Sequence, residues 1–308
     1  MIDKNSPRLI VISGATATGK TDVAFALAKK LECEILSFDS VQIYKHLDIG
    51  TAKPPLWMRN EIPHHLIDEI EPSEPFTAGD FQRRARKIIS LENKKKNIVL
   101  VGGTGFYLQA LLRGMYEIPV VTRVVKEKLL VEQQTRGLDV LYAELKTKDS
   151  EYAKRIHPND SYRILRALEL IRSGTKTVTE IRAEFSTHHF PYPVLHIGLR
   201  RKRDSLLDSV AKRTEKMIES GLIEETKSLI KNLGRDLKPL ESVGYRETVA
   251  FLDGVLDRNS LKDQIVRSTM ALAKRQSTWF KKDESIIWLD PDVEGARITE
   301  QILDIAYH

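Results

Sequence analysis

Eight residues near the N-terminus have the types and spacing of a phosphate-binding loop. They follow the apolar stretch Leu9–Ile12 and fit G-x-x-x-x-G-K-[ST], with the residues Gly14, Ala15, Thr16, Ala17, Thr18, Gly19, Lys20 and Thr21. In such loops, backbone N–H groups and the positive end of the following helix surround the anion. Lys20 is expected to reach the outer phosphates and Thr21 to hold Mg²⁺. The sequence therefore predicts binding of a chain of phosphates, with Mg²⁺ as the cofactor.

A single carboxylate follows the next apolar run. Ile35 and Leu36 have the character of a buried strand, which places Asp39 just past its carboxyl end. Open α/β sheets bind their ligands at that edge. A carboxylate beside bound phosphates is unfavourable unless it takes a proton or holds a metal. Asp39 is therefore a candidate base or metal ligand, and a turn or helix-capping aspartate is the equally plausible structural alternative.

The first hundred residues alternate short apolar runs with amphipathic stretches. We expect strands at Leu9–Ile12, Ile35–Leu36 and Ile98–Val101, and helices at Thr21–Lys30 and Thr77–Asn93. This βαβα order is typical of a mostly parallel sheet in an α/β fold. The phosphate loop and Asp39 then both follow strand ends.

The pattern changes after Leu112. From Pro119 the chain reads as successive helices, until the apolar run Val194–Leu199 resumes the sheet; Ile286–Leu289 is a last apolar run in a mainly helical remainder. The predicted fold class is α/β: a P-loop NTPase-like core with a mostly parallel sheet, plus an all-helical insertion. The predicted domains are residues 1–118 for the first part of the core, 119–199 for the helical insertion and 200–308 for the second, mainly helical part of the core.

Composition limits the class of protein. A chain of 308 residues, 41% of them hydrophobic, suits one large or two moderate domains. The single cysteine, Cys33, excludes an internal disulfide framework and a cysteine-rich zinc site, and it is expected between a helix and a strand. No stretch approaches the roughly 18 apolar residues of a membrane span. We therefore expect a cytoplasmic protein without a membrane partner.

The positive charge is unevenly distributed. The net charge is +6, and residues 119–205 hold 17 Lys and Arg against 11 Asp and Glu, whereas the rest of the chain holds 32 of each sign. Four of these cations form the run Arg200–Arg203, which by itself is more often solvated surface. A basic region on a neutral core favours a polyanionic partner such as a nucleic acid.

Several blocks resemble, in the same order, the tRNA dimethylallyltransferases, also called tRNA isopentenyltransferases. The resemblance runs from about Leu9 to Trp279, and its blocks are Gly14–Thr21, Asp39–Tyr44, Asp48–Lys53, Val101–Tyr107, His157–Asp160 with Arg163–Glu169, Val243–Glu247 and Lys274–Trp279. This ordered set is far more specific than the phosphate loop alone, which many kinases and NTPases share.

The resemblance implies a prenyl transfer reaction. The family transfers a dimethylallyl group from dimethylallyl diphosphate to the exocyclic N6 of adenosine 37 in tRNA. The phosphate loop, with Arg213 as a second cation, would then bind the diphosphate leaving group. Asp39 would accept the proton from N6, and Thr104 would hydrogen-bond near the bridging oxygen. From its position alone, the default role of Thr104 is to cap the helix that follows, and the resemblance implies that its hydroxyl both caps the helix and contacts the ligand.

The resemblance also implies which residues meet tRNA. The adenine must leave the stacked anticodon loop to react, so the expected partner is the anticodon stem-loop of tRNA, with the helical insertion closing over the stem. The protein is expected to be a monomer. The residues expected to contact tRNA are Asp39, Ser40, Val41, Gln42, Thr104, Lys126, Tyr162, Arg163, Ile164, Leu165, Arg166, Val243, Gly244, Tyr245 and Arg246.

The chain departs from the family pattern after Pro119. Where relatives often carry an acidic residue and then an arginine, this chain reads Val-Val-Thr-Arg-Val-Val-Lys, so either Arg123 or Lys126 could replace that arginine. The zinc-finger extension of the eukaryotic enzymes is missing, which favours the bacterial type.

Two other functions stay open on the sequence. An adenylate isopentenyltransferase would use the same donor and phosphate loop on free AMP or ATP, but it has no need of a basic insertion of this length. A P-loop kinase for a small metabolite would hold ATP in the loop, but it gives no reason for the blocks at Asp39 and Val243 to occur together.

Overall fold

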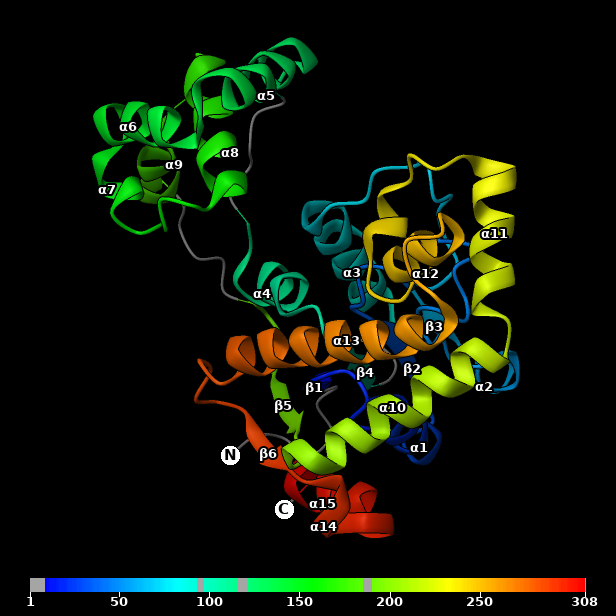
Figure 1. Ribbon diagram of the computed structural model, residues 1–308. Helices are drawn as coiled ribbons and strands as arrows, with labels where there is room; N and C mark the ends of the chain where they lie inside the picture. The colour runs from blue at the N-terminus through cyan, green and yellow to red at the C-terminus, as the bar shows by residue number, and fades with distance from the viewer. Residues whose placement is uncertain (1–8, 93–96, 116–120, 175, 185–189, 308) are drawn as a thin grey trace. The chain divides into compact units, whose positions relative to one another are not determined.

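The computed structural model describes residues 9–92, 97–115, 121–174, 176–184 and 190–307. They form two compact units (Figure 1): a core unit, made of Met1–Leu112 together with Phe190–His308, and a helical unit, Arg113–His189. The core unit is therefore discontinuous in sequence, as expected for a domain that carries an insertion.

One six-stranded sheet organises the core unit. All its strand pairs are parallel, in the order β3-β2-β4-β1-β5-β6. The strands are β1 (Leu9–Gly14), β2 (Glu34–Ser37), β3 (His64–His65), β4 (Ile98–Val101), β5 (Val194–Leu199) and β6 (Ile287–Leu289). The predicted α/β class is confirmed. The two residues of β3 are too few to leave a periodic signal, and this strand was not predicted.

The remaining elements of the core unit are helices. They are α1 (Lys20–Lys30), α2 (Leu56–Glu61), α3 (Ala78–Glu92), α4 (Gly105–Arg113), α10 (Arg203–Glu219), α11 (Leu222–Leu233), α12 (Tyr245–Leu252), α13 (Arg258–Phe280), α14 (Pro291–Glu294) and α15 (Ile298–Tyr307), with short 3₁₀ helices η1 (Lys238–Glu241) and η2 (Gly295–Arg297). The predicted end of α3, Asn93, lies outside the described residues. Within the described ranges, no helix combines the length and apolar character needed to cross a membrane.

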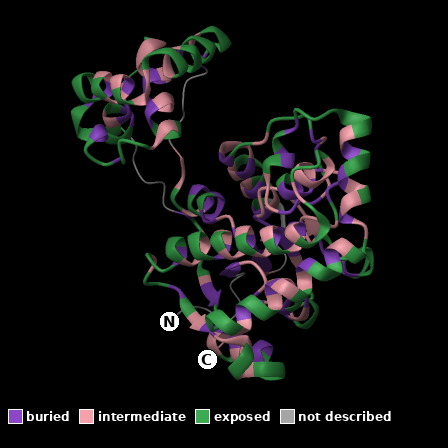
Figure 2. Cartoon of the chain, viewed as in Figure 1, coloured by how far each residue is buried: buried purple, intermediate pink, exposed green. Residues whose placement is uncertain are grey.

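Helices cover both faces of the sheet, which is why β1 is buried along its whole length (Figure 2). On one face, α1 and α15 pack against strand residues such as Ile10 and Ile197. The preceding residue, His196, faces the other way, where its ring contacts Phe280 of α13. Cys33 is buried between α1 and β2, as predicted. Because helices cover both faces, a ligand can reach the sheet at the edge formed by the carboxyl ends of the strands.

The helical unit has its own apolar core. Its helices are α5 (Arg123–Arg136), α6 (Leu138–Lys148), α7 (Ser150–Ala153), α8 (Ser161–Arg172) and α9 (Val178–Glu184). Arg172 of α8 binds Glu132 of α5 at 2.7 Å and Glu144 of α6 at 2.6 Å. This arginine therefore ties three helices together around the apolar cluster.

The predicted insertion, residues 119–199, ends ten residues too late. The helical unit ends at His189, and β5 pairs with β1 from Leu9 opposite Val194 to Gly14 opposite Leu199. The apolar run of β5 therefore belongs to the core sheet. The predicted start, Pro119, lies outside the described residues.

The positive charge is shared between the units. The run Arg200–Arg203 follows β5 and so belongs to the core unit, and residues 113–189 keep 14 Lys and Arg against 11 Asp and Glu. The interpretation of a basic insertion on a neutral core is corrected accordingly, because half of the surplus lies in the core unit.

Candidate active site

The phosphate loop connects β1 to α1, as predicted. Gly14 has φ of +139°, and a Cβ there would lie 2.3 Å from the carbonyl oxygen of Leu199, so only glycine fits. Gly19 (φ +87°) precedes α1 in a left-handed conformation. Ala17 also has a positive φ, +64°, which is strained for a residue with a Cβ. The loop is held in an unusual shape at a helix N-terminus, where anions bind.

Lys20 and Arg213 are two partly buried cations beside this loop. Nζ of Lys20 donates a hydrogen bond of 2.6 Å to the carbonyl oxygen of Ala15. Burial and the charge of Arg213 lower the pKa of Lys20 to about 7, and the charge of Asp39 opposes this shift. Burial also lowers the pKa of Arg213, again against the attraction of Asp39. A polyvalent anion would relieve this repulsion between Lys20 and Arg213.

Asp39 uses one carboxylate oxygen for local structure. Its Oδ1 accepts hydrogen bonds from the N–H groups of Val41 at 2.9 Å and Gln42 at 3.3 Å, so the turn role is confirmed. Among the described residues, both hydrogen bonds to this carboxylate end on Oδ1. The Thr104 hydroxyl accepts the N–H of Ser40 at 3.1 Å, which places Thr104 beside the same turn. Oδ2 is therefore available as a proton acceptor.

One pocket of about 440 Å³ collects most candidate residues of the core unit. Those that line it are Thr16, Ala17, Gly19, Lys20, Thr21, Asp39, Val41, Gln42, Arg213, Val243 and Gly244. Thr18 is buried, and its hydroxyl donates to the carbonyl oxygen of Ala15, so these two residues can serve a ligand only through the backbone. The topology thus brings residues from both halves of the chain around the phosphate loop.

The block Val243–Arg246 reaches the pocket only in part. Tyr245 is 0% exposed, and its hydroxyl donates to Glu225 at 2.5 Å. Arg246 is exposed and pairs with Glu247 at 2.7 Å. The expected direct contact of the Tyr245 side chain with tRNA is therefore corrected, because the ring is enclosed by protein and can act only by holding its neighbours.

Gln276 and Arg201 line the pocket but were not among the candidates predicted from the sequence. Gln276 of α13 accepts the N–H of Thr16 through Oε1 at 2.8 Å. Arg201 lies over the phosphate loop, with Nη2 3.9 Å from where a Cβ on Gly19 would be, and it is held by Asp292 at 3.1 Å. The Lys274–Trp279 block could have indicated Gln276. The sequence around Arg201 has no feature that distinguishes it from the other three cations of the run Arg200–Arg203.

Replacing Arg201 with glutamine should weaken binding of inorganic pyrophosphate about tenfold, because one charge-assisted hydrogen bond is lost beside the loop. Nη1 of Arg201 is held by Ser209 at 3.0 Å and Asp292 at 3.1 Å, whereas Nη2 faces Gly19 of the phosphate loop. Isothermal titration calorimetry measures the effect. Arg200→Gln removes the same charge from an exposed neighbour and should change the affinity less than twofold; equal losses in both variants would assign the effect to net charge alone.

The candidates of the helical unit lie on α5 and α8. Lys126 and Tyr162 are exposed, and the Arg163 side chain is 58% exposed beside its partner Asp160. Ile164 is 0% exposed in the core of this unit, so its predicted contact with tRNA is wrong for the side chain. Leu165 also packs against that core, and Arg166 pairs with Glu169 at 2.5 Å. The exposed polar positions thus remain the predicted tRNA contacts.

Thr21 fits the role of a magnesium ligand. It lines the pocket at the start of α1, next to Lys20. Among the described residues, no group of three or more His, Cys, Asp or Glu could bind a metal by itself. Mg²⁺ commonly binds through one or two protein oxygens, substrate phosphates and water. The donor set therefore suits a metal that arrives with its phosphate ligand.

The parallel sheet, the loop after β1 and the cations Lys20 and Arg213 beside it define a P-loop protein whose pocket suits a phosphorylated ligand. The model of the family described as IPP transferase matches residues 42–283. The chain belongs to this IPP transferase family.

Individual relatives agree with this assignment. The chain is 42% identical to tRNA dimethylallyltransferase 2 of Syntrophus aciditrophicus over 291 residues, covering 94% of this chain and 93% of the relative. It is similar to a solved tRNA isopentenylpyrophosphate transferase of Bacillus halodurans, with 35% identity, coverage of 97% and 95%, and a TM-score of 0.71. A eukaryotic dimethylallyltransferase acting on tRNA is similar at 28% identity, with coverage of 97% and 78% and a TM-score of 0.80.

Proposed function

We propose that the protein is an enzyme that transfers a dimethylallyl group from dimethylallyl diphosphate to tRNA. The observation that carries the proposal is a pocket lined by Asp39 together with residues of the phosphate loop and the cations Lys20 and Arg213. A leaving-group site and a base are the two things this transfer needs. The family membership and the names of the relatives agree with it.

The chemistry divides between the two sides of the pocket. As the C1–O bond of the donor breaks, negative charge grows on the diphosphate, where loop N–H groups, Lys20 and Arg213 stabilise it. The N6 amine of the acceptor adenosine forms the new C–N bond and gives its proton to Oδ2 of Asp39. Mg²⁺, held by Thr21 and the phosphates, would neutralise further charge on the leaving group.

The finer parts of the proposal concern the acceptor. We expect adenosine 37 in the anticodon stem-loop, flipped from its stack, with Gln42, Val243 and Gly244 near it. Lys126, Tyr162 and Arg163 would contact the same tRNA from the helical unit. We also expect a cytoplasmic monomer, which sedimentation at several protein concentrations tests.

Single-turnover transfer from labelled dimethylallyl diphosphate tests the function. Unmodified tRNA with adenosines at positions 36 to 38, free AMP and free ATP are offered in parallel. Label on tRNA alone supports the proposal. Label on AMP or ATP would make the protein a nucleotide prenyltransferase, and phosphoryl transfer from labelled ATP to a small acceptor would make it a kinase.

A further inference from the structure

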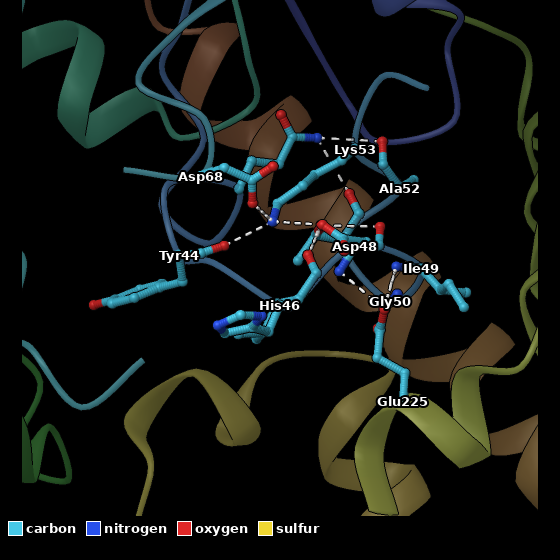
Figure 3. Close-up of polar contacts among 12 residues, drawn as sticks. Tyr44, His46, Asp48, Ile49, Gly50, Ala52, Lys53, Asp68 and Glu225 are labelled. Carbon is cyan, nitrogen blue, oxygen red and sulfur yellow. Dashed lines mark hydrogen bonds and ion pairs between the residues drawn. The ribbon is translucent and has the colours of Figure 1, made fainter. Parts of the chain in front are cut away.

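The loop Asp48–Lys53 borders the pocket and is fixed by a carboxylate from outside it. Glu225 of α11 points at the loop backbone (Figure 3). Its oxygens accept the N–H groups of Asp48 at 3.0 Å, Ile49 at 2.9 Å and Gly50 at 3.2 Å. Three successive backbone donors thus converge on one side chain, which resembles the binding of an anion by a backbone nest.

Tyr245 completes this arrangement. Its hydroxyl donates to the same carboxylate at 2.5 Å, and a Cβ on Gly50 would lie 2.5 Å from its ring. Burial and the charge of Glu225 raise the pKa of this tyrosine, so it stays a donor. Three segments far apart in the sequence therefore meet at Glu225: the loop, α11 and the first residue of α12.

Lys53 fixes the other end of the loop. Its side chain is 2% exposed, and Nζ donates to the carbonyl oxygen of Tyr44 at 2.7 Å and to Oδ1 of Asp48 at 2.8 Å (Figure 3). It also pairs with Asp68, which Arg59 binds in turn. The loop is therefore held at both ends by charged groups with several hydrogen bonds each.

The backbone around this loop is strained. His46, Ala52 and Asp68 have φ of +66°, +51° and +58°, a left-handed conformation that residues with a Cβ rarely adopt. Such strain persists only where surrounding contacts determine the conformation. Glu225 and Lys53 supply those contacts, which indicates that the shape of the loop is specific.

The loop in turn orients Gln42. Nε2 of Gln42 donates to the carbonyl oxygens of Thr51 at 3.2 Å and Ala52 at 3.3 Å, while Oε1 accepts from the Ser37 hydroxyl at 3.3 Å. Gln42, Thr51 and Ala52 all line the pocket. A shift of the loop would therefore move the Gln42 amide relative to Asp39, three residues away.

We propose that Glu225 is a positioning residue: by holding the loop Asp48–Lys53 it fixes the side chain of Gln42 where the acceptor adenosine must bind. The inference rests on the proposed function, because it concerns placement of the acceptor and not of the diphosphate. Glu225 itself does not line the pocket, and Figure 3 shows it approaching the loop from the side of α11.

The test compares Glu225→Gln with Glu224→Gln, its exposed neighbour on α11. In either orientation of the new amide, its NH₂ group replaces a carboxylate oxygen that accepted a backbone N–H. That N–H therefore loses its acceptor. We expect the single-turnover rate at saturating tRNA to fall about tenfold in E225Q and less than twofold in E224Q. Affinity for inorganic pyrophosphate, measured by calorimetry, should change less than twofold in both, because the phosphate loop is untouched.

A double-mutant cycle with Gln42→Ala tests the route of the effect. If Glu225 acts through Gln42, adding E225Q to Q42A should slow transfer less than twofold further. Equal rates in E225Q and E224Q, a parallel loss of pyrophosphate affinity, or an undiminished E225Q effect in the Q42A background would each overturn the inference. Wild-type protein that transfers nothing to tRNA would instead refute the proposed function.

Tyr245→Phe provides a second variant should E225Q fail to fold. It removes one donor from the carboxylate and keeps the ring that packs on Gly50. We expect about a threefold slower transfer, unchanged pyrophosphate affinity and the same loss of effect in the Q42A background. A rate equal to wild type in this variant would count against the inference.

Discussion

Asp39→Asn is expected to transfer the dimethylallyl group about 10²- to 10⁴-fold more slowly than the wild type while it binds tRNA as tightly. Asparagine keeps Oδ1, which accepts the N–H groups of Val41 and Gln42, so the turn survives. It replaces Oδ2 with an NH₂ group, which has no lone pair to take the N6 proton. Single-turnover rates and filter-binding affinities for tRNA measure the two effects.

Comparison with Asp39→Ala separates the contribution of Asp39 as a base from its contribution to the turn. This variant removes both oxygens, so any extra loss relative to Asp39→Asn reports the two backbone hydrogen bonds at Oδ1. A transfer rate of Asp39→Asn near that of the wild type would end the general-base hypothesis. The aspartate would then be a structural turn residue, which was the alternative left open by the sequence.

Affinity for inorganic pyrophosphate should fall with rising pH above about 7, by about tenfold per pH unit relative to the Lys20→Met variant. Lys20 in the free protein has its pKa lowered to about 7 by burial and by Arg213. A bound anion favours the ammonium form. Below pH 7, Lys20 is already protonated, so binding takes up no proton at this residue. Above pH 7, each binding event must protonate Lys20.

The comparison with Lys20→Met cancels the titration of pyrophosphate itself. The variant should bind about ten- to hundredfold more weakly at pH 7, since it lacks a charge-assisted hydrogen bond. Calorimetry in buffers of different ionisation enthalpy should detect proton uptake by the wild type near pH 8 and less in the variant. Parallel affinity curves for the two proteins would show that Lys20 does not titrate on binding.

The sequence by itself determined the elements whose signal is local. Residues 14–21 predicted the phosphate loop because its conformation depends on two glycines at a fixed spacing and on a helix that starts at Lys20. The position of Asp39 followed from one apolar run, since a carboxylate just past a buried strand must lie at the ligand edge of a parallel sheet. The parallel class followed from alternating strand and helix periods.

The tertiary structure alone decided which distant residues share the pocket. Arg201, Gln276 and Glu225 have ordinary helical or surface contexts in the sequence, and only the pairing of β5 with β1 and the packing of α11 and α13 bring them to the phosphate loop and to the loop Asp48–Lys53. Packing against α11 encloses Tyr245, and the apolar core of the helical unit encloses Ile164, although the motifs of both residues had suggested contact with tRNA. Local patterns set backbone conformation through hydrogen bonds and sterics within a few residues, whereas tertiary contacts join segments far apart in the sequence, such as Thr16 and Gln276, which are separated by 260 residues.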